Sequence, residues 1–164
     1  MSADDIDLVD VYSCFPSAVQ TACQELGIDT NRQLTVTGGL TFAGGPLNNY
    51  VMHSIARMTQ LLRENPGKRG MITANGGYIT KHAFGIYSSE APAQPFQHAD
   101  LQEQVDATPK REVVIGHHGK GVVESYSVMY GPQGVTKGFV STRLDDGRRA
   151  WGISEDAGLS LIHI

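Results

Sequence analysis

The chain has 164 residues, enough for one ordinary domain or for parts of two. Hydrophobic residues make up 40% and charged residues 18%, with 19 glycines, which suits a mixed α/β protein with many tight turns and argues against a disordered chain. The net charge of −4 and the lack of a Lys/Arg-rich run argue against a nucleic-acid-binding protein.

The first part of the chain predicts alternating strands and helices. "IDLVDVYS" (6–13) is an apolar, β-branched run that indicates a buried strand, and "PSAVQTACQELG" indicates a helix after it. "QLTVTGG" (33–39) predicts a strand that runs into a glycine-rich loop. A helix capped by Asn48 or Asn49 follows, and its predicted buried stripe is Val51, Ile55, Met58 and Leu62.

Residues 70–90 predict two strands joined by a turn at Asn75-Gly76-Gly77, a strong hairpin signal. The composition then changes, and the proline-containing "APAQPF" favours a linker over 91–109, within which "ADLQEQVDA" is compatible with one short helix. Residues 110–158 contain β-type runs at hairpin spacing and predict an all-β module, a small barrel of the oligonucleotide/oligosaccharide-binding (OB) type.

The last six residues, "LSLIHI" (159–164), resemble the translation of a transposase end sequence used to prepare sequencing libraries. We therefore expect them to be an artefact, although a natural apolar tail strand is the alternative. The acidic start does not have the pattern of a signal peptide, and no apolar run approaches the length of a membrane span. Two cysteines form neither a disulfide framework nor a zinc site, so a cytoplasmic location is expected.

Individual motifs do not assign a reaction. The spacing from Gly39 to Gly44 opens a phosphate-binding loop, but Gly45-Pro46 follows where such a loop needs Lys and Ser/Thr, so a nucleoside triphosphatase is rejected. His82 is more simply a structural residue on a strand than a catalyst. Cys14 lies between a strand and a helix but has no basic neighbour in sequence to activate it, so a structural role is again favoured.

Three ordered motifs together go further. "DIDLVDVYSCFPSAVQ", "TGGLTFAGGPLNNYVMHSIARM" and "TANGGYITKHAFGIYSSE" resemble the C-terminal half of the thiolase superfamily. The resemblance is to thiolase-like proteins of the acetyl-CoA acetyltransferase class, some of which carry an additional C-terminal β-domain. It implies that residues 1–90 belong to the thiolase-like domain and 110–158 to an incomplete added domain. The half that carries the nucleophilic cysteine is not in this chain, so we expect a fragment.

The resemblance also assigns residues one by one. The Asn-Glu-Ala-Phe motif, His-Asp-Cys-Phe in the sterol-carrier type, matches Tyr12 to Phe15, where Cys14 and Phe15 fit the second form. The Gly-His-Pro motif matches Gly44-Gly45-Pro46, so glycine stands where the family has its catalytic histidine. The Cys-x-Gly-Gly motif matches Ala74 to Gly77, so its thiol is absent too.

What remains for chemistry is a short set of residues. The candidate catalytic groups are Asn75, which can donate to a thioester carbonyl, and His82, the one titratable base near that hairpin in sequence. No metal or prosthetic group is implied, and coenzyme A is the carrier of the substrate. The substrate-binding residues implied by the resemblance are Tyr12, Cys14, Phe15, Gly44, Gly45, Pro46, Gly76 and Gly77.

Three functional hypotheses follow. In the first, the chain is part of an acyl-CoA acyltransferase of lipid metabolism, a homo-oligomer when whole, and is inactive by itself. In the second, the protein binds acyl-CoA without catalysis, which Gly45 and Ala74 favour. In the third, the β-module binds single-stranded nucleic acid through stacking aromatics and nearby cations; the favoured alternative is that these aromatics are core residues and the charges lie on solvated turns. The residues for that role are Tyr126, Tyr130, Phe139, Trp151, Lys120, Lys137, Arg143, Arg148 and Arg149.

Overall fold

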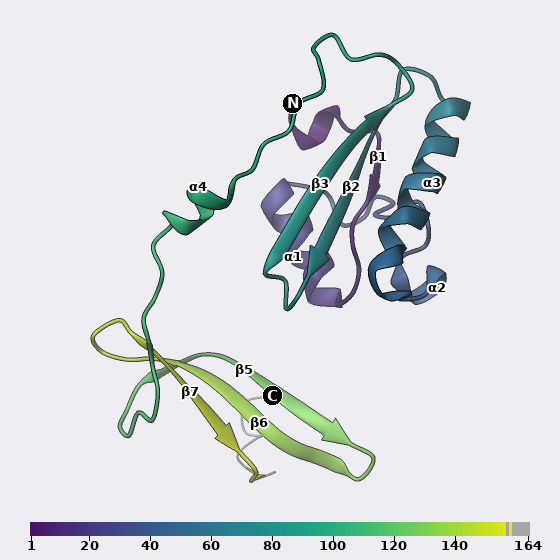
Figure 1. Cartoon of the computed structure of the whole chain (residues 1–164). Coiled ribbons are helices and arrows are strands. Elements are labelled where there is room, and N and C mark those ends of the chain that lie inside the picture. The colour runs from purple at the N-terminus through teal and green to yellow at the C-terminus, as the bar shows by residue number, and fades with distance from the viewer. Residues whose placement is uncertain (157, 159–164) are drawn as a thin grey trace. The chain divides into compact units, whose positions relative to one another are not determined.

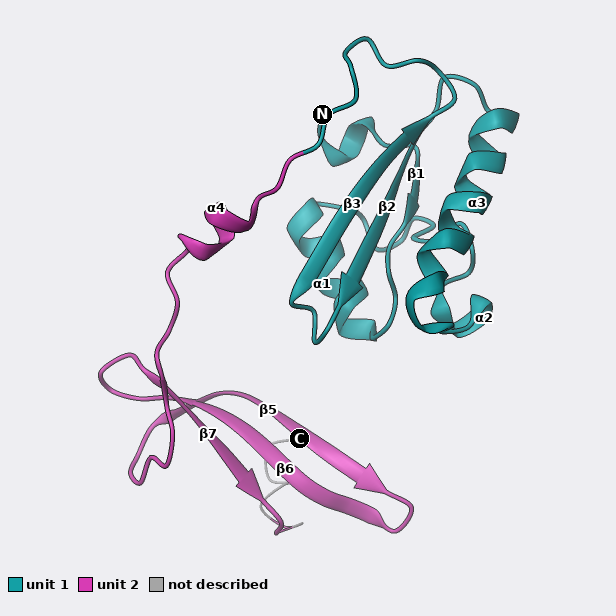
Figure 2. Cartoon of the chain, in the orientation of Figure 1, with its two compact units in different colours: residues 1–98 teal, residues 99–164 magenta. Residues whose placement is uncertain are grey.

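The computed structural model describes residues 1–156 and residue 158, and it divides the chain into two compact units, Met1–His98 and Ala99–Ile164 (Figure 2). The division falls inside the expected 91–109 linker. Each unit is described by itself. No helix of the described residues is long and apolar enough to cross a membrane. The suspected artefact at 159–164 lies outside the described residues.

Unit 1 is a three-stranded sheet with helices on both faces (Figure 1). The strand order is β1-β2-β3, with β1 parallel to β2 and β2 antiparallel to β3. Its elements are η1 (Ala3–Asp5), β1 (Leu8–Asp10), α1 (Pro16–Leu26), α2 (Leu40–Ala43), η2 (Leu47–Asn49), α3 (Tyr50–Glu64), β2 (Arg69–Gly76) and β3 (Lys81–Ser88).

Alternation along the strands divides the core of unit 1 into two layers, because successive strand residues point to opposite faces. Val9 and Met71 pack with Cys23 of α1 on one face. Ile72 packs with Met58 and Leu62 of α3 on the other. The predicted helices and the hairpin are therefore confirmed, although the loop of the hairpin runs from Gly77 to Thr80, just after the predicted turn. Asn49 precedes α3 as expected, but its side chain makes no capping hydrogen bond.

The strand predicted over 33–39 is wrong, because the structure has no strand there. The segment does lie beside β1, and the backbone N–H of Val11 donates to the carbonyl of Leu34 at 2.8 Å. Further along the segment, the amides of Val36 and Thr37 donate to the side-chain carboxylate of Asp10 at 2.9 and 3.2 Å. A side chain thus takes the hydrogen bonds that a neighbouring strand would take, so the ladder stops.

Asp10 connects three parts of unit 1. Its side chain is 0% exposed and accepts five hydrogen bonds: two from the amides above and three from the hydroxyls of Thr37, Tyr50 and Ser54, at 2.9 to 3.1 Å. Each donor is a neutral group. A buried charge needs this many partners, because water no longer solvates it. Burial also raises the pKa of the Tyr50 hydroxyl, which favours the protonated form that donates to Asp10.

Unit 2 contains α4 (Gln102–Asp106), β4 (Val113–Val114), β5 (Val122–Gly131), β6 (Gly134–Arg143) and β7 (Arg149–Ser154). The four strands form one sheet in the order β4-β7-β6-β5, so the predicted all-β module and short helix are confirmed. The sheet does not close on itself within residues 99–156, and the expected barrel is therefore corrected to an open sheet for the part that the structure describes. Register shifts on β5 near Glu124 and near Met129 bend the strand.

Replacing Asp10 should strongly destabilise unit 1. Asp10→Ala leaves buried amide and hydroxyl donors without an acceptor, and we expect a loss of about 3 to 5 kcal/mol in the free energy of unfolding. Asp10→Asn keeps the shape and one acceptor and should lose less. Urea unfolding measures the loss of stability. Hydrogen exchange of the Val36 and Thr37 amides shows whether the hydrogen bonds to residue 10 are lost. Asp7→Asn is the control, because this exposed carboxylate accepts a single hydrogen bond, from the Arg69 amide, and the amide that replaces it keeps an acceptor oxygen. A loss within about 0.5 kcal/mol for Asp10→Ala would contradict the proposed role of Asp10.

A second stability prediction concerns the contact of α3 with β2. A Cβ atom at Gly70 would overlap the side chain of Met58 from its Cγ to its Cε, in a packed core layer. Gly70→Ala should therefore cost about 1 to 3 kcal/mol. Gly45→Ala is the matched control, because a Cβ there would lie 3.8 Å from its nearest neighbour, Leu40. Equal melting temperatures for the two variants would show that α3 is not packed as closely as described.

Candidate functional site

The three motifs that carry the family resemblance meet at one edge of the unit 1 sheet. β1 and β2 are parallel, so the segment that follows β1, Tyr12–Phe15, lies at the same end of the sheet as the last residues of β2 and the start of the hairpin loop, Asn75–Gly77. The amide of Tyr12 donates to Thr73 Oγ1 at 2.9 Å, which fixes the first segment to β2. The glycine loop joins them, because the amide of Leu40 donates to Ser13 Oγ at 2.9 Å.

Cys14 and Asn75 are in direct contact although they are 61 positions apart. Cys14 Sγ lies 3.1 Å from Asn75 Oδ1, and both side chains are half-buried. An amide oxygen is an acceptor, so the thiol is the donor in this hydrogen bond. The structure places the thiol of Cys14 beside the candidate catalytic amide, and the structural role that the sequence favours for Cys14 stays a prediction.

His82 lies next to this pair but is directed elsewhere. It is the register partner of Asn75 across β2 and β3. Its Nε2 lies 3.0 Å from the carbonyl oxygen of Ile79, which can only accept. In the neutral ring Nε2 therefore carries the proton and Nδ1 is the free acceptor. The ring is exposed and stacks on Phe84 with a centroid distance of 6.4 Å.

Ala74 and Asn75 point to opposite faces of the sheet. Ala74 is two residues beyond Ile72, which packs on α3, whereas Asn75 is two residues beyond Thr73 and shares its face. Asn75 is thus a neighbour of the ancestral thiol position in sequence but projects from the other side of the strand. The side chain of Asn75 contacts Cys14, and it does not occupy the position that a thiol at 74 would have.

The glycine loop contains glycines of two kinds. Gly39 (φ 78°) and Gly44 (φ 81°) have backbone conformations that L side chains rarely adopt, and a Cβ at 39 would lie 2.7 Å from Ser13 Oγ. Gly45 has neither restriction, so the absence of a side chain there is not required by the fold. The loop from Gly44 to Pro46 is exposed. A Cβ atom at 45 would therefore meet only ordinary van der Waals contact, 3.8 Å from Leu40.

The remaining predicted binding residues line the same region. Tyr12 is half-buried, and its ring meets that of Tyr50 edge to face, with centroids 5.3 Å apart. Phe15 precedes α1 and is 49% exposed. Gly76 and Gly77 end β2 and begin the hairpin loop. Asp10, which supports Tyr12 through Tyr50, was not predicted from the sequence; its only signal was that it is one of two acidic residues in the apolar run 6–13.

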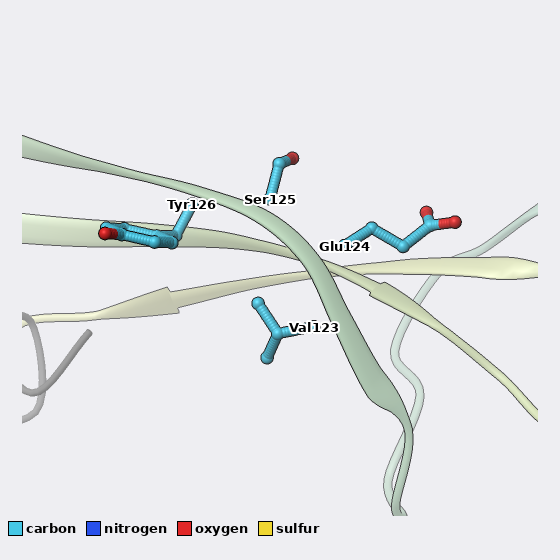
Figure 3. Close-up of a pocket in the computed structure, with 4 residues that line it drawn as sticks. All are labelled: Val123, Glu124, Ser125 and Tyr126. Carbon is cyan, nitrogen blue, oxygen red and sulfur yellow. The ribbon is translucent and has the colours of Figure 1, made fainter. Parts of the chain in front are cut away.

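Unit 2 carries a separate feature, a shallow depression lined by Val123, Glu124, Ser125 and Tyr126 (Figure 3). Arg149 Nε donates to Glu124 Oε2 at 2.8 Å, and this hydrogen bond holds the pKa of Glu124 below its usual range. Arg148 is similarly paired with Asp146, and Lys137 with Glu155. Tyr126, Tyr130 and Trp151 are exposed, but the acids that pair with three of the predicted cations weaken the case for nucleic acid. Among the described residues no group of His, Cys, Asp and Glu could hold a metal ion.

Comparison with known proteins matched a family model and solved structures. Residues 100–160 match the family described as the thiolase-like protein type 1 additional C-terminal domain. The chain is also similar to a solved structure, a monomeric SCP2-thiolase like protein type 1 from Mycobacterium smegmatis, with 38% sequence identity and a TM-score of 0.86. That match covers 97% of this chain and 36% of the other chain, so this sequence spans about a third of its relative. A comparison with curated proteins found no match.

The fold and the three converging motifs define a segment of a thiolase-superfamily protein. Within that superfamily the chain belongs to the SCP2-thiolase-like proteins, and its second unit is their additional C-terminal domain. The resemblance to a thiolase-like protein is confirmed, and the acetyl-CoA acetyltransferase activity stays a prediction. The matched relative is described as monomeric, and the expected homo-oligomer stays a prediction.

The two cysteines should differ sharply in reactivity. Cys14 is half-buried at the site. Cys23, on the buried face of α1, is only 2% exposed, and its burial raises the pKa of its thiol. Iodoacetamide should therefore modify Cys14 in the native chain and reach Cys23 only after denaturation, because the thiolate is the reactive form. Both cysteines lie on one tryptic peptide, residues 1–32, so fragmentation of that peptide by tandem mass spectrometry shows which thiol is modified. Equal native labelling of the two thiols would contradict the described packing.

Proposed function

We propose that unit 1 forms one wall of an acyl-CoA site, in a protein that transfers acyl groups between coenzyme A thioesters. One observation carries this proposal: the three loops meet, and Cys14 Sγ lies 3.1 Å from Asn75 Oδ1 at their junction. A side-chain amide and a thiol at the carboxyl ends of parallel strands can hold a thioester carbonyl and move a proton next to it. Coenzyme A is the carrier of the substrate, and no prosthetic group is needed.

The reaction class is the making or breaking of a carbon–carbon bond between two acyl-CoA thioesters. Its nucleophile is a cysteine thiolate that attacks the thioester carbonyl, supplied by a part of the protein outside this chain. Negative charge develops on the carbonyl oxygen, and a hydrogen bond from Asn75 would stabilise it. Cys14 is the thiol within reach of that position, and His82, with its free Nδ1, is the next candidate for proton transfer.

A second function is supported by what the site lacks. Gly45 and Ala74 provide no group that can accept a proton, and loss of a general base costs orders of magnitude in rate. The protein would then bind acyl-CoA without turning it over. Since Gly45 has room for a side chain, Gly45→His with Ala74→Cys in the whole protein separates the two functions. If the double variant gains a large acetoacetyl-CoA cleavage activity, the native protein is a non-catalytic acyl-CoA-binding protein. If the native protein already cleaves acetoacetyl-CoA at a normal rate, the non-catalytic function is excluded.

The 164-residue chain should bind acetyl-CoA in calorimetry and show no thiolysis of acetoacetyl-CoA, because the nucleophile is elsewhere. Gly39→Ala should abolish binding, since its Cβ would strike Ser13 Oγ and displace the loop. Gly27→Ala is the matched control: it also has a positive φ (67°), but a Cβ there meets no atom within 4 Å, and it lies at the end of α1. Measurable thiolysis would overturn the predicted inactivity, and absence of binding would overturn the acyl-CoA site.

A further inference from the structure

We infer that Cys14 is a positioning residue that fixes the orientation of the Asn75 carboxamide, so that Asn75 Nδ2 is presented to the carbonyl oxygen of a bound thioester. This inference rests on the proposed acyl-CoA site. It assigns Cys14 a role through Asn75, and it assigns Asn75 the role of hydrogen-bond donor.

The direction of the hydrogen bond determines which end of the amide is free. A carboxamide has one acceptor atom and one donor atom, and rotation by half a turn exchanges them. The Cys14 thiol donates a hydrogen bond to Asn75 Oδ1, with Sγ 3.1 Å from the oxygen. Asn75 Nδ2 makes no hydrogen bond with any other described residue, so both of its protons are available to a ligand.

Both partners are held by regular structure. Asn75 lies within the continuous β2–β3 ladder, opposite His82. Cys14 is preceded by two anchored residues, because Tyr12 donates to Thr73 and Ser13 accepts from Leu40, and α1 begins two positions later. The thiol and the amide are therefore brought together by fixed backbones, which is the condition for a preorganised donor.

Among the residues that the structure describes, no side chain other than that of Cys14 donates to Asn75 Oδ1. His82, the cross-strand neighbour of Asn75, donates its Nε2 proton to the carbonyl oxygen of Ile79. Without the thiol the carboxamide could turn and present Oδ1 to the ligand, where two carbonyl oxygens would repel each other. The Cys14 proton thus selects the binding-competent orientation of Asn75.

The experiment uses acetyl-CoA labelled with ¹³C at the thioester carbonyl, bound to the 164-residue chain and observed by NMR. A donor at the carbonyl oxygen moves the carbonyl resonance downfield relative to free acetyl-CoA. We expect this shift in the native chain and in Cys14→Ser, which keeps a donor. It should largely disappear in Asn75→Ala and Cys14→Ala, with about two- to tenfold weaker binding, the effect of one hydrogen bond.

Cys23→Ala is the matched control, because it removes the other thiol, which lies on the buried face of α1. It should leave the carbonyl shift unchanged. Circular dichroism of each variant establishes that it is folded. A carbonyl shift in Cys14→Ala equal to that of the native chain, with Asn75→Ala reduced, overturns the positioning role alone. A shift unaffected by Asn75→Ala overturns the donor role as well. If acetyl-CoA does not bind the native chain at all, the proposed function fails, and this inference with it.

Discussion

The carboxylate of Asp10 is the interaction on which unit 1 depends. It lies inside β1 and collects donors from the 36–37 segment and from two turns of α3. No apolar contact could specify these positions as narrowly, because hydrogen bonds to a buried charge require particular directions. Tyr50, held by this carboxylate, in turn supports Tyr12 at the start of the candidate site. The geometry of the site is thus set by a charge that no ligand would touch.

The two-residue period of the strands decides which side chains can act together. It sends Asp10 toward α3 and Val9 toward α1, and it separates Ala74 from Asn75 at the end of β2. The contact of Cys14 with Asn75 is therefore on the face opposite the position where the family resemblance places its acid/base thiol. The loops that carry the family resemblance are present, and the side chains in contact where they meet are those of Cys14 and Asn75.

The local elements could be predicted from the sequence, but the contacts between distant segments could not. Periodicity identified α1 and α3, and Asn75-Gly76-Gly77 placed the hairpin to within a few residues. The strand over 33–39 failed because Asp10, more than twenty positions away, takes its amide hydrogen bonds. The resemblance selected the correct loops, yet the Cys14–Asn75 contact depends on the parallel register of β1 and β2, which leaves no local pattern.

Titration of the ¹⁵N-labelled chain with acetyl-CoA tests the location of the site most directly. The largest amide shift changes should fall on the segments that meet at the carboxyl ends of β1 and β2: Tyr12–Phe15, Gly39–Pro46 and Asn75–Gly77. The depression at Val123–Tyr126 in unit 2 should be unaffected. Changes that map to Val123–Tyr126, or that are absent from the three converging loops at saturating ligand, would contradict an acyl-CoA site in unit 1.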